Sequence, residues 1–142
     1  MIKDVLINIV GFQGIDGEGD TIEFTSEGRF GFKDGEYFIS YDEGQMFEEK
    51  IEVKTKIFIK KDNSVTLERK GSINSKMFIE EGKRNSCFYN TPFGDLLISV
   101  FGEKIENNLN ENGGKINLKY TIDSDMKMIS RNQVDILVKE VN

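Results

Sequence analysis

The 142-residue sequence contains no histidine, no tryptophan and no alanine, and it has one cysteine and one proline. Without histidine, the chain cannot build a Ser-His-Asp or Cys-His nucleophilic site, a histidine-ligated zinc or haem, or an imidazole pH switch. The missing alanine removes the strongest helix former. Isoleucine, valine, threonine, phenylalanine and tyrosine are plentiful, and these residues favour strands. The absences therefore argue against the commonest catalytic systems and for a sheet protein.

Charge and cysteine content limit the cellular compartments and the classes of partner that we expect for this protein. The single cysteine, Cys87, has no partner for an internal disulfide, so nothing indicates an oxidising compartment. No run approaches the roughly 18 apolar residues of a membrane-spanning helix, and the N-terminal segment lacks a signal-peptide cleavage site. The formal net charge of −6 repels phosphate backbones and anionic lipid. We therefore expect a cytoplasmic protein with no nucleic-acid and no membrane partner.

Apolar and polar residues alternate with a period of two from Thr21 to Lys33. A strand places alternate positions on opposite faces, one apolar and one wet. Ser26 and Gly28 interrupt the apolar face, and a glycine there often marks a bulge or a sharp bend. The segment predicts a long strand that curls around a barrel.

Further strands are predicted between short turns. Asp34-Gly35 predicts a type I′ hairpin turn, because both central positions of that turn need positive φ. Asp62-Asn63 predicts a second turn. Together with the N-terminal segment and 21–33, the chain holds about nine or ten predicted strands, a pattern typical of an all-β antiparallel meander closed into one barrel domain spanning residues 1–142. The remaining predicted strands are 36–43, 51–60, 65–70, 73–80, 84–91, 96–101, 116–122 and 128–141.

The middle of the chain contains sequence motifs that are more informative about the protein's family than the composition is. The stretches that carry a family resemblance are VTLERKG (65–71), SKMF (75–78), EGK (81–83), YNTPFG (89–94), the opening KDVLINIVGFQ (3–13), the segment 34–43 and GGKI (113–116). In these stretches the chain resembles the YwiB-like family of small bacterial proteins. The resemblance covers nearly the whole chain and implies a calycin-like, lipocalin-like meander barrel of about 8–10 strands. It implies no activity, because the family's function is unknown. The tryptophan of the lipocalin signature is absent, so lipocalin ligands such as retinoids and haem are not carried over.

Polar residues on apolar faces are the candidate ligand-binding residues. Arg69 shares its predicted face with Val65 and Leu67, and a buried guanidinium needs a carboxylate or a ligand anion. We expect a polar patch inside the barrel that orients a small ligand. Its predicted members are Arg69, Glu43, Tyr41, Ser75, Tyr89 and Tyr120. The alternative left open is that Arg69 reaches solvent near a strand end or forms a structural ion pair in the barrel.

Two charged segments predict surface roles. Residues 16–20, DGEGD, with Glu27 resemble a calcium loop in composition, but Thr21 stands where the EF-hand has glycine, so we expect a solvated acidic turn and no metal site. Lys54, Lys56, Lys60 and Lys61 form a basic stripe beside Phe58. Such stripes occur on nucleic-acid-binding faces and on protected sheet surfaces, and the acidic net charge favours the second interpretation.

Catalysis has little support in the residues. Cys87 is predicted to be a small buried residue, although Lys83 or Arg84 nearby would lower the pKa of its thiol. Glu23 and Glu27 lie on the wet face of one predicted strand, about 13 Å apart, which is beyond the separation used in glycoside hydrolysis. We therefore favour a non-catalytic protein without a cofactor, and an enzyme acting through carboxylates or Cys87 is left open as a third, unsupported alternative.

The leading functional hypothesis is a binding protein that holds a small, partly apolar ligand in the lumen or mouth of the barrel. The alternative is a structural or protein-interaction module whose barrel is filled with its own side chains. A homodimer is also left open. An enclosed cavity of about 300 Å³ or more, lined by Arg69 and tyrosines, distinguishes the first hypothesis from the second.

Overall fold

The computed structural model describes residues 2–15, 18–42, 53–71, 74–91, 94–124 and 127–141; for Tyr89, Thr91, Lys127 and Met128 it describes the backbone alone. Within these ranges the chain forms ten β-strands in sequence order. They are β1 (Ile2–Ile15), β2 (Glu18–Lys33), β3 (Glu36–Asp42), β4 (Val53–Ile59), β5 (Val65–Gly71), β6 (Asn74–Ile79), β7 (Arg84–Thr91), β8 (Gly94–Asn110), β9 (Gly113–Ser124) and β10 (Lys127–Glu140).

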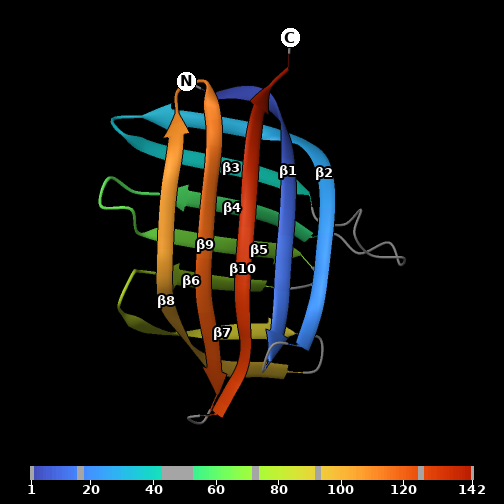
Figure 1. The fold of residues 1–142 in the computed structure, drawn as a ribbon, viewed down its shortest axis with the longest axis vertical. Helices are drawn as coiled ribbons and strands as arrows, with labels where there is room; N and C mark the ends of the chain where they lie inside the picture. Colours follow the sequence, from blue (N-terminus) through green and yellow to red (C-terminus); the bar gives the residue numbers. More distant parts are fainter. Residues whose placement is uncertain are drawn as a thin grey trace.

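The strands close into one antiparallel meander barrel, as predicted. Each strand pairs with its sequence neighbours, and β1 also pairs with β10, which closes the ladder. In Figure 1, β1, β2, β8, β9 and β10 run along the long axis of the molecule, and β3 to β7 cross behind them. No helix in the described part of the chain is long and apolar enough to cross a membrane.

The strand β2 belongs to both layers of the barrel. It pairs with β1 from Glu18 to Gly31 and with β3 from Gly28 onward. A Cβ at Gly28 would lie 2.3 Å from the carbonyl oxygen of Ser40 and 2.4 Å from Cδ1 of Ile7. The register on both sides of this glycine is unbroken, so a bulge here is wrong. The glycine instead lets the backbone approach a neighbouring strand and a core side chain.

The strand β8 is much longer than the predicted strand 96–101. Its pairing with β9 shifts between Gly102 and Lys104, which marks a β-bulge, and then continues to Asn110. Beyond the bulge, Ile105 and Leu109 are buried. The bulge reverses which residues of the strand face inward, from even to odd numbers, and a strict period-two pattern therefore ends at the bulge.

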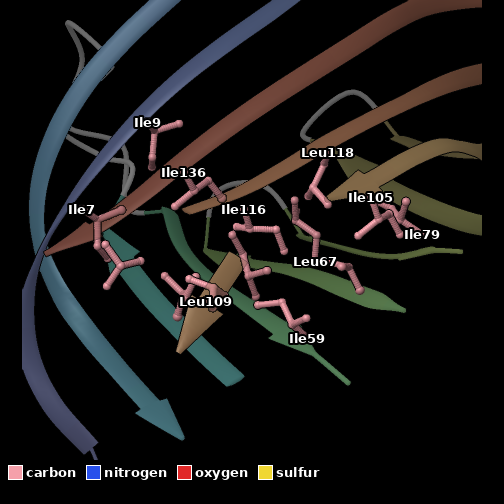
Figure 2. Close-up of a cluster of buried hydrophobic side chains, with 14 of the residues drawn as sticks. Ile7, Ile9, Ile59, Leu67, Ile79, Ile105, Leu109, Ile116, Leu118 and Ile136 are labelled. Atoms are coloured by element: carbon pink, nitrogen blue, oxygen red, sulfur yellow. The ribbon is translucent and has the colours of Figure 1, made fainter. Parts of the chain in front are cut away.

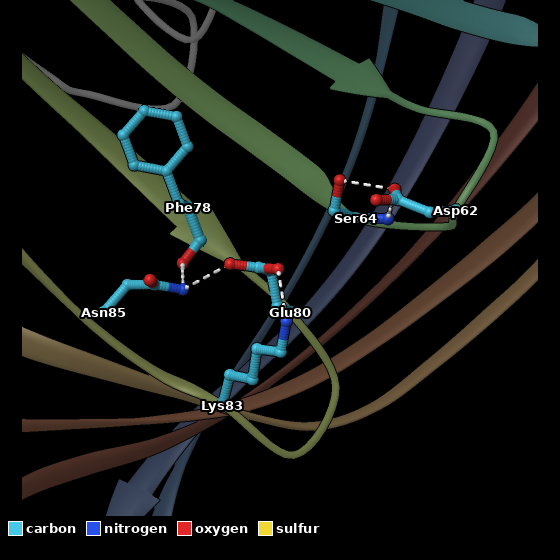
Figure 3. A network of polar contacts seen from close by, with 6 residues as sticks. All are labelled: Asp62, Ser64, Phe78, Glu80, Lys83 and Asn85. Atoms are coloured by element: carbon cyan, nitrogen blue, oxygen red, sulfur yellow. Dashed lines mark hydrogen bonds and ion pairs between the residues drawn. The ribbon is translucent and has the colours of Figure 1, made fainter.

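Two hairpin turns form where the sequence predicted them. Asp34 and Gly35 both have positive φ, 53° and 79°, as a type I′ turn requires. In the second turn, Oδ1 of Asp62 accepts hydrogen bonds from the hydroxyl of Ser64 at 2.7 Å and its backbone N–H at 2.9 Å (Figure 3). These bonds, that of the hydroxyl above all, lower the pKa of the Asp62 carboxyl.

Apolar side chains from both layers meet in the centre of the barrel. Most are isoleucine, leucine and valine from inward positions, and 14 of the residues in one cluster are drawn in Figure 2. The fully buried large side chains include Phe30, Ile7, Ile39, Ile57, Ile59, Met77, Ile79, Ile116, Leu118 and Ile136. Burial of one such side chain contributes about 1.5–3 kcal/mol, so this cluster supplies most of the driving force for closure.

In the described residues, β6 and β7 share fewer backbone pairs than any other two neighbouring strands. Among the described residues, these strands pair only at Asn74–Asn90 and Ser75–Tyr89. Further along, the side chain of Asn85 donates from Nδ2 to the carbonyl oxygen of Phe78 at 3.3 Å and to Oε1 of Glu80 at 3.2 Å (Figure 3). The side-chain hydrogen bonds of Asn85 therefore link the two strands beyond the segment where their backbones pair.

Replacing Gly28 with alanine is expected to destabilise the barrel, because the new Cβ would overlap backbone and core atoms. We expect a loss of about 1–3 kcal/mol in the free energy of unfolding, measured by urea denaturation. Gly11→Ala is the matched control on β1, since nothing lies within 4 Å of a Cβ there. Equal stability of the two variants would contradict the close approach at Gly28.

Hydrogen exchange is expected to be faster for the β6 amides that face β7 than for amides in the fully paired β1–β2 ladder. Asn85→Ala should raise this rate further, because it removes the bridge to Phe78. The measurement is exchange followed by NMR. Uniform protection across both ladders would show that the seam between β6 and β7 is closed by other contacts.

Candidate functional site

Five register partners form a row across β3 to β7, near one edge of that layer, and on β3 to β6 their side chains are polar and face inward. Strand pairing places Tyr41 opposite Thr55, Thr55 opposite Arg69, Arg69 opposite Ser75 and Ser75 opposite Tyr89. Directly opposite residues share a face of a sheet, with Cβ atoms about 4.5–5.5 Å apart. We call these five residues the polar row. Four of them, Tyr41, Arg69, Ser75 and Tyr89, were predicted from the sequence.

Two hydroxyl groups of the polar row are buried without hydrogen-bond partners among the described residues. Thr55 is fully buried and Ser75 is 7% exposed. Neither the Oγ1 of Thr55 nor the Oγ of Ser75 has a hydrogen-bond partner there. A buried hydroxyl without a partner costs about 1–3 kcal/mol. Both groups flank Arg69, one from each neighbouring strand, so two costly positions adjoin one cation.

Arg69 lies in the middle of the polar row. Its side chain is half-buried, and its Nε is among the buried atoms. A guanidinium offers five N–H donors in a fixed plane, more than a single carboxylate can accept. The row therefore places one cation between two buried hydroxyl groups.

Apolar residues lie on both sides of the polar row. We call the buried apolar row next to it, deeper in the barrel, the floor. The next inward row consists of Ile39, Ile57, Leu67 and Met77, all buried, which pair across the same strands. The ring of Tyr41 packs against Phe24 of β2, with centroids 6.0 Å apart. Leu96, which pairs with Tyr89, is 53% exposed. The exposed apolar surface beside the row is therefore that of Leu96, while the floor is covered.

The remaining two predicted site residues are Tyr120 and Glu43. Tyr120 is buried on β9, opposite Gly102 of β8 and Asn132 of β10, so it does not belong to the polar row. Alternation along the strand predicted the inward face of Tyr120 correctly, but it could not predict which residues lie beside Tyr120 on the neighbouring strands. Glu43 lies outside the described residues. Thr55 was missed as a site residue, although a hydroxyl within the run Val53, Thr55 and Ile57 was the signal for it.

Two surface hollows lie away from the polar row. One, of about 440 Å³, is bordered by Ile2, Phe38 and Phe58 at the end of the β2–β3 hairpin. The other, of about 140 Å³, lies between Lys104, Glu106 and Lys119 on the outer face of β8 and β9. Neither is lined by Arg69 or by the other members of the row. In the described residues, no cluster of three or more acidic or cysteine side chains is placed to hold a metal ion.

Cys87 is half-buried on β7 and packs against the apolar core. Burial raises the pKa of its thiol. The alternative that Lys83 or Arg84 lowers this pKa is not found; Lys83 pairs with Glu80 and Arg84 with Asp123. The raised pKa disfavours the thiolate, which is the nucleophilic form.

The family model for a domain of unknown function, DUF1934, matches residues 7–136. The chain belongs to this family. The crystal structure of the YwiB protein from Bacillus subtilis is similar to this DUF1934 barrel, with a TM-score of 0.84 over 99% of this chain and 94% of that chain. The two sequences are 20% identical, so the likeness shows a shared fold. It confirms the predicted resemblance to YwiB-like proteins. None of the curated proteins matches this chain.

The Cys87 thiol of this DUF1934 protein is expected to react slowly with iodoacetamide at pH 7. Its raised pKa leaves less thiolate in the folded state than in the unfolded chain. The alkylation rate, measured by mass spectrometry with and without urea, should rise on unfolding. Faster alkylation of the folded protein would indicate a cation near Cys87 that lowers the pKa.

Proposed function

We propose that the barrel binds a small amphipathic anion at its polar row, with the anionic group between Thr55, Arg69 and Ser75. The observation that carries the proposal is the pair of buried hydroxyls without hydrogen-bond partners among the described residues. An acceptor group of a ligand would satisfy one of the two hydroxyls and gain charge-assisted bonds from the guanidinium. Such a molecule binds as cargo or as a signal, and the proposal includes no reaction.

The surroundings of the row support an apolar part in the ligand. The centre of the barrel is occupied by a contiguous cluster of buried side chains, which supports binding at the mouth rather than deep in the lumen. Next to the row lie the buried floor, which includes Leu67 and Met77, and the half-exposed Leu96. An aromatic or short aliphatic body would bury apolar area against these side chains. Each Å² of apolar surface that is buried would stabilise the complex by about 25 cal/mol.

The proposal is tested with 1-anilinonaphthalene-8-sulfonate (ANS), a probe with an apolar ring system and one anionic group. We expect its fluorescence to rise on binding to the folded protein. Arg69→Gln should weaken the binding about tenfold or more, because it removes a charge-assisted hydrogen bond worth about 1.5–3 kcal/mol. Equal binding to the wild-type protein and to Arg69→Gln would overturn the proposed site.

Thr55→Val is expected to separate stability from binding. Valine has nearly the shape of threonine and removes a buried hydroxyl that has no hydrogen-bond partner among the described residues. The free energy of unfolding should therefore stay the same or increase by about 1 kcal/mol, while the affinity for ANS decreases. Both are measured on the same preparation, by urea denaturation and by fluorescence titration.

The matched control is Thr121→Val, since Thr121 is also a buried threonine but lies on β9, outside the polar row. It should leave the affinity for ANS unchanged. If Thr55→Val destabilised the barrel and left ANS binding intact, its hydroxyl would have a structural role and the proposal would fail.

A further inference from the structure

The outer surface of β3 to β6 carries exposed lysines in two cross-strand rows. In the first, Lys56 lies opposite Glu68, which lies opposite Lys76. In the second, Lys54 lies directly opposite Lys70. All four lysines are exposed. We call Lys54, Lys56, Lys70 and Lys76 the lysine face.

The pairing of Lys54 with Lys70 is unfavourable within the protein itself. Like charges directly opposite each other on neighbouring strands destabilise a sheet. Among the described residues, two carboxylates lie among the four lysines: Glu68, which pairs with Lys70 at 3.3 Å, and Asp42, which lies opposite Lys54. In the part of the chain that the structure describes, the face thus carries an excess of positive charge, although the whole chain has a net charge of −6. A bound anionic partner would remove the repulsion between Lys54 and Lys70.

An apolar surface adjoins the lysine face on the same strands. Phe38 lies opposite Phe58 with ring centroids 5.4 Å apart, and Phe58 and Phe78 flank the buried Thr66. Phe58 and Phe78 are 37% and 41% exposed. We call Phe38, Phe58 and Phe78 the aromatic row. The hollow of about 440 Å³ opens beside Phe38 and Phe58 and has room for an apolar side chain.

We propose that the lysine face and the aromatic row form a docking surface for an acidic segment of a partner protein. Carboxylates of the segment would lie over Lys54 and Lys70, and an apolar side chain of the segment would enter the hollow beside Phe58. Charge complementarity selects an acidic partner, and the exposed rings select one that also carries apolar residues. The surface lies on the opposite side of the sheet from the polar row and does not depend on ligand binding there.

Two other occupants fit less well. A second copy of this chain docked through the same face would place lysines against lysines, because a two-fold interface repeats the same patch on both partners. A nucleic acid would meet the same lysines and rings, but the net charge of −6 repels a polyphosphate chain more strongly than a short acidic peptide.

The test measures the fluorescence anisotropy of a labelled peptide of about ten residues that contains four glutamates and two phenylalanines. The peptide is titrated with the wild-type protein at low salt and at 0.5 M salt. The same peptide with glutamine in place of glutamate, and an oligo-dT of equal length, serve as comparison probes. We expect the acidic peptide to bind at low salt, to bind at least tenfold more weakly at 0.5 M salt, and to bind more tightly than either comparison probe.

The variants separate the lysine face from the total charge. The double variant Lys54→Gln, Lys70→Gln should weaken binding of the acidic peptide at least tenfold and keep or raise the melting temperature. Lys115→Gln, Lys139→Gln makes the same change in net charge at exposed positions on β9 and β10, away from the lysine face, and should bind like the wild type. Equal weakening by both doubles, equal binding of the glutamine peptide, or tighter binding of oligo-dT would each overturn the proposal.

Discussion

Closure of the antiparallel ladder is the constraint on which the rest of the structure depends. Once β1 pairs with β10, the register between neighbouring strands fixes which residues face the interior. A shift of one residue in any strand would turn its apolar set outward, against the burial free energy of the whole cluster. The hydrophobic core therefore fixes the position of the polar row, even though the row contributes little to the core.

The β3–β6 sheet carries different chemistry on its two sides. Inside, Thr55, Arg69 and Ser75 place hydroxyls and a cation beside an apolar floor. Outside, on the same strands, Lys54 and Lys70 form a like-charged pair next to exposed aromatic rings. Buried hydroxyls without partners among the described residues and opposed lysines both cost stability. Stability alone explains neither feature; in the two proposals, a bound molecule would offer an acceptor to the hydroxyls and the opposite charge to the lysines.

The sequence predicted the strand faces well where alternation was unbroken. The inward Tyr37, Ile39 and Tyr41 of β3 and the hairpin at Asp34-Gly35 follow from local pattern and turn chemistry. Alternation could not predict the second half of β8, because one extra residue after Gly102 reverses the pattern and the asparagine-rich end of the strand gives no propensity signal. Periodicity also cannot supply register between strands. It placed Arg69 and Tyr120 on inward faces alike, while only pairing shows that Arg69 adjoins Thr55 and Ser75 and that Tyr120 belongs elsewhere.

A crystal structure of the protein grown with ANS tests the central claim most directly. We expect the sulfonate within hydrogen-bond distance of the Thr55 or Ser75 hydroxyl and of the Arg69 guanidinium, with the rings against Leu96. A sulfonate bound elsewhere, with both hydroxyls still without acceptors, would contradict it.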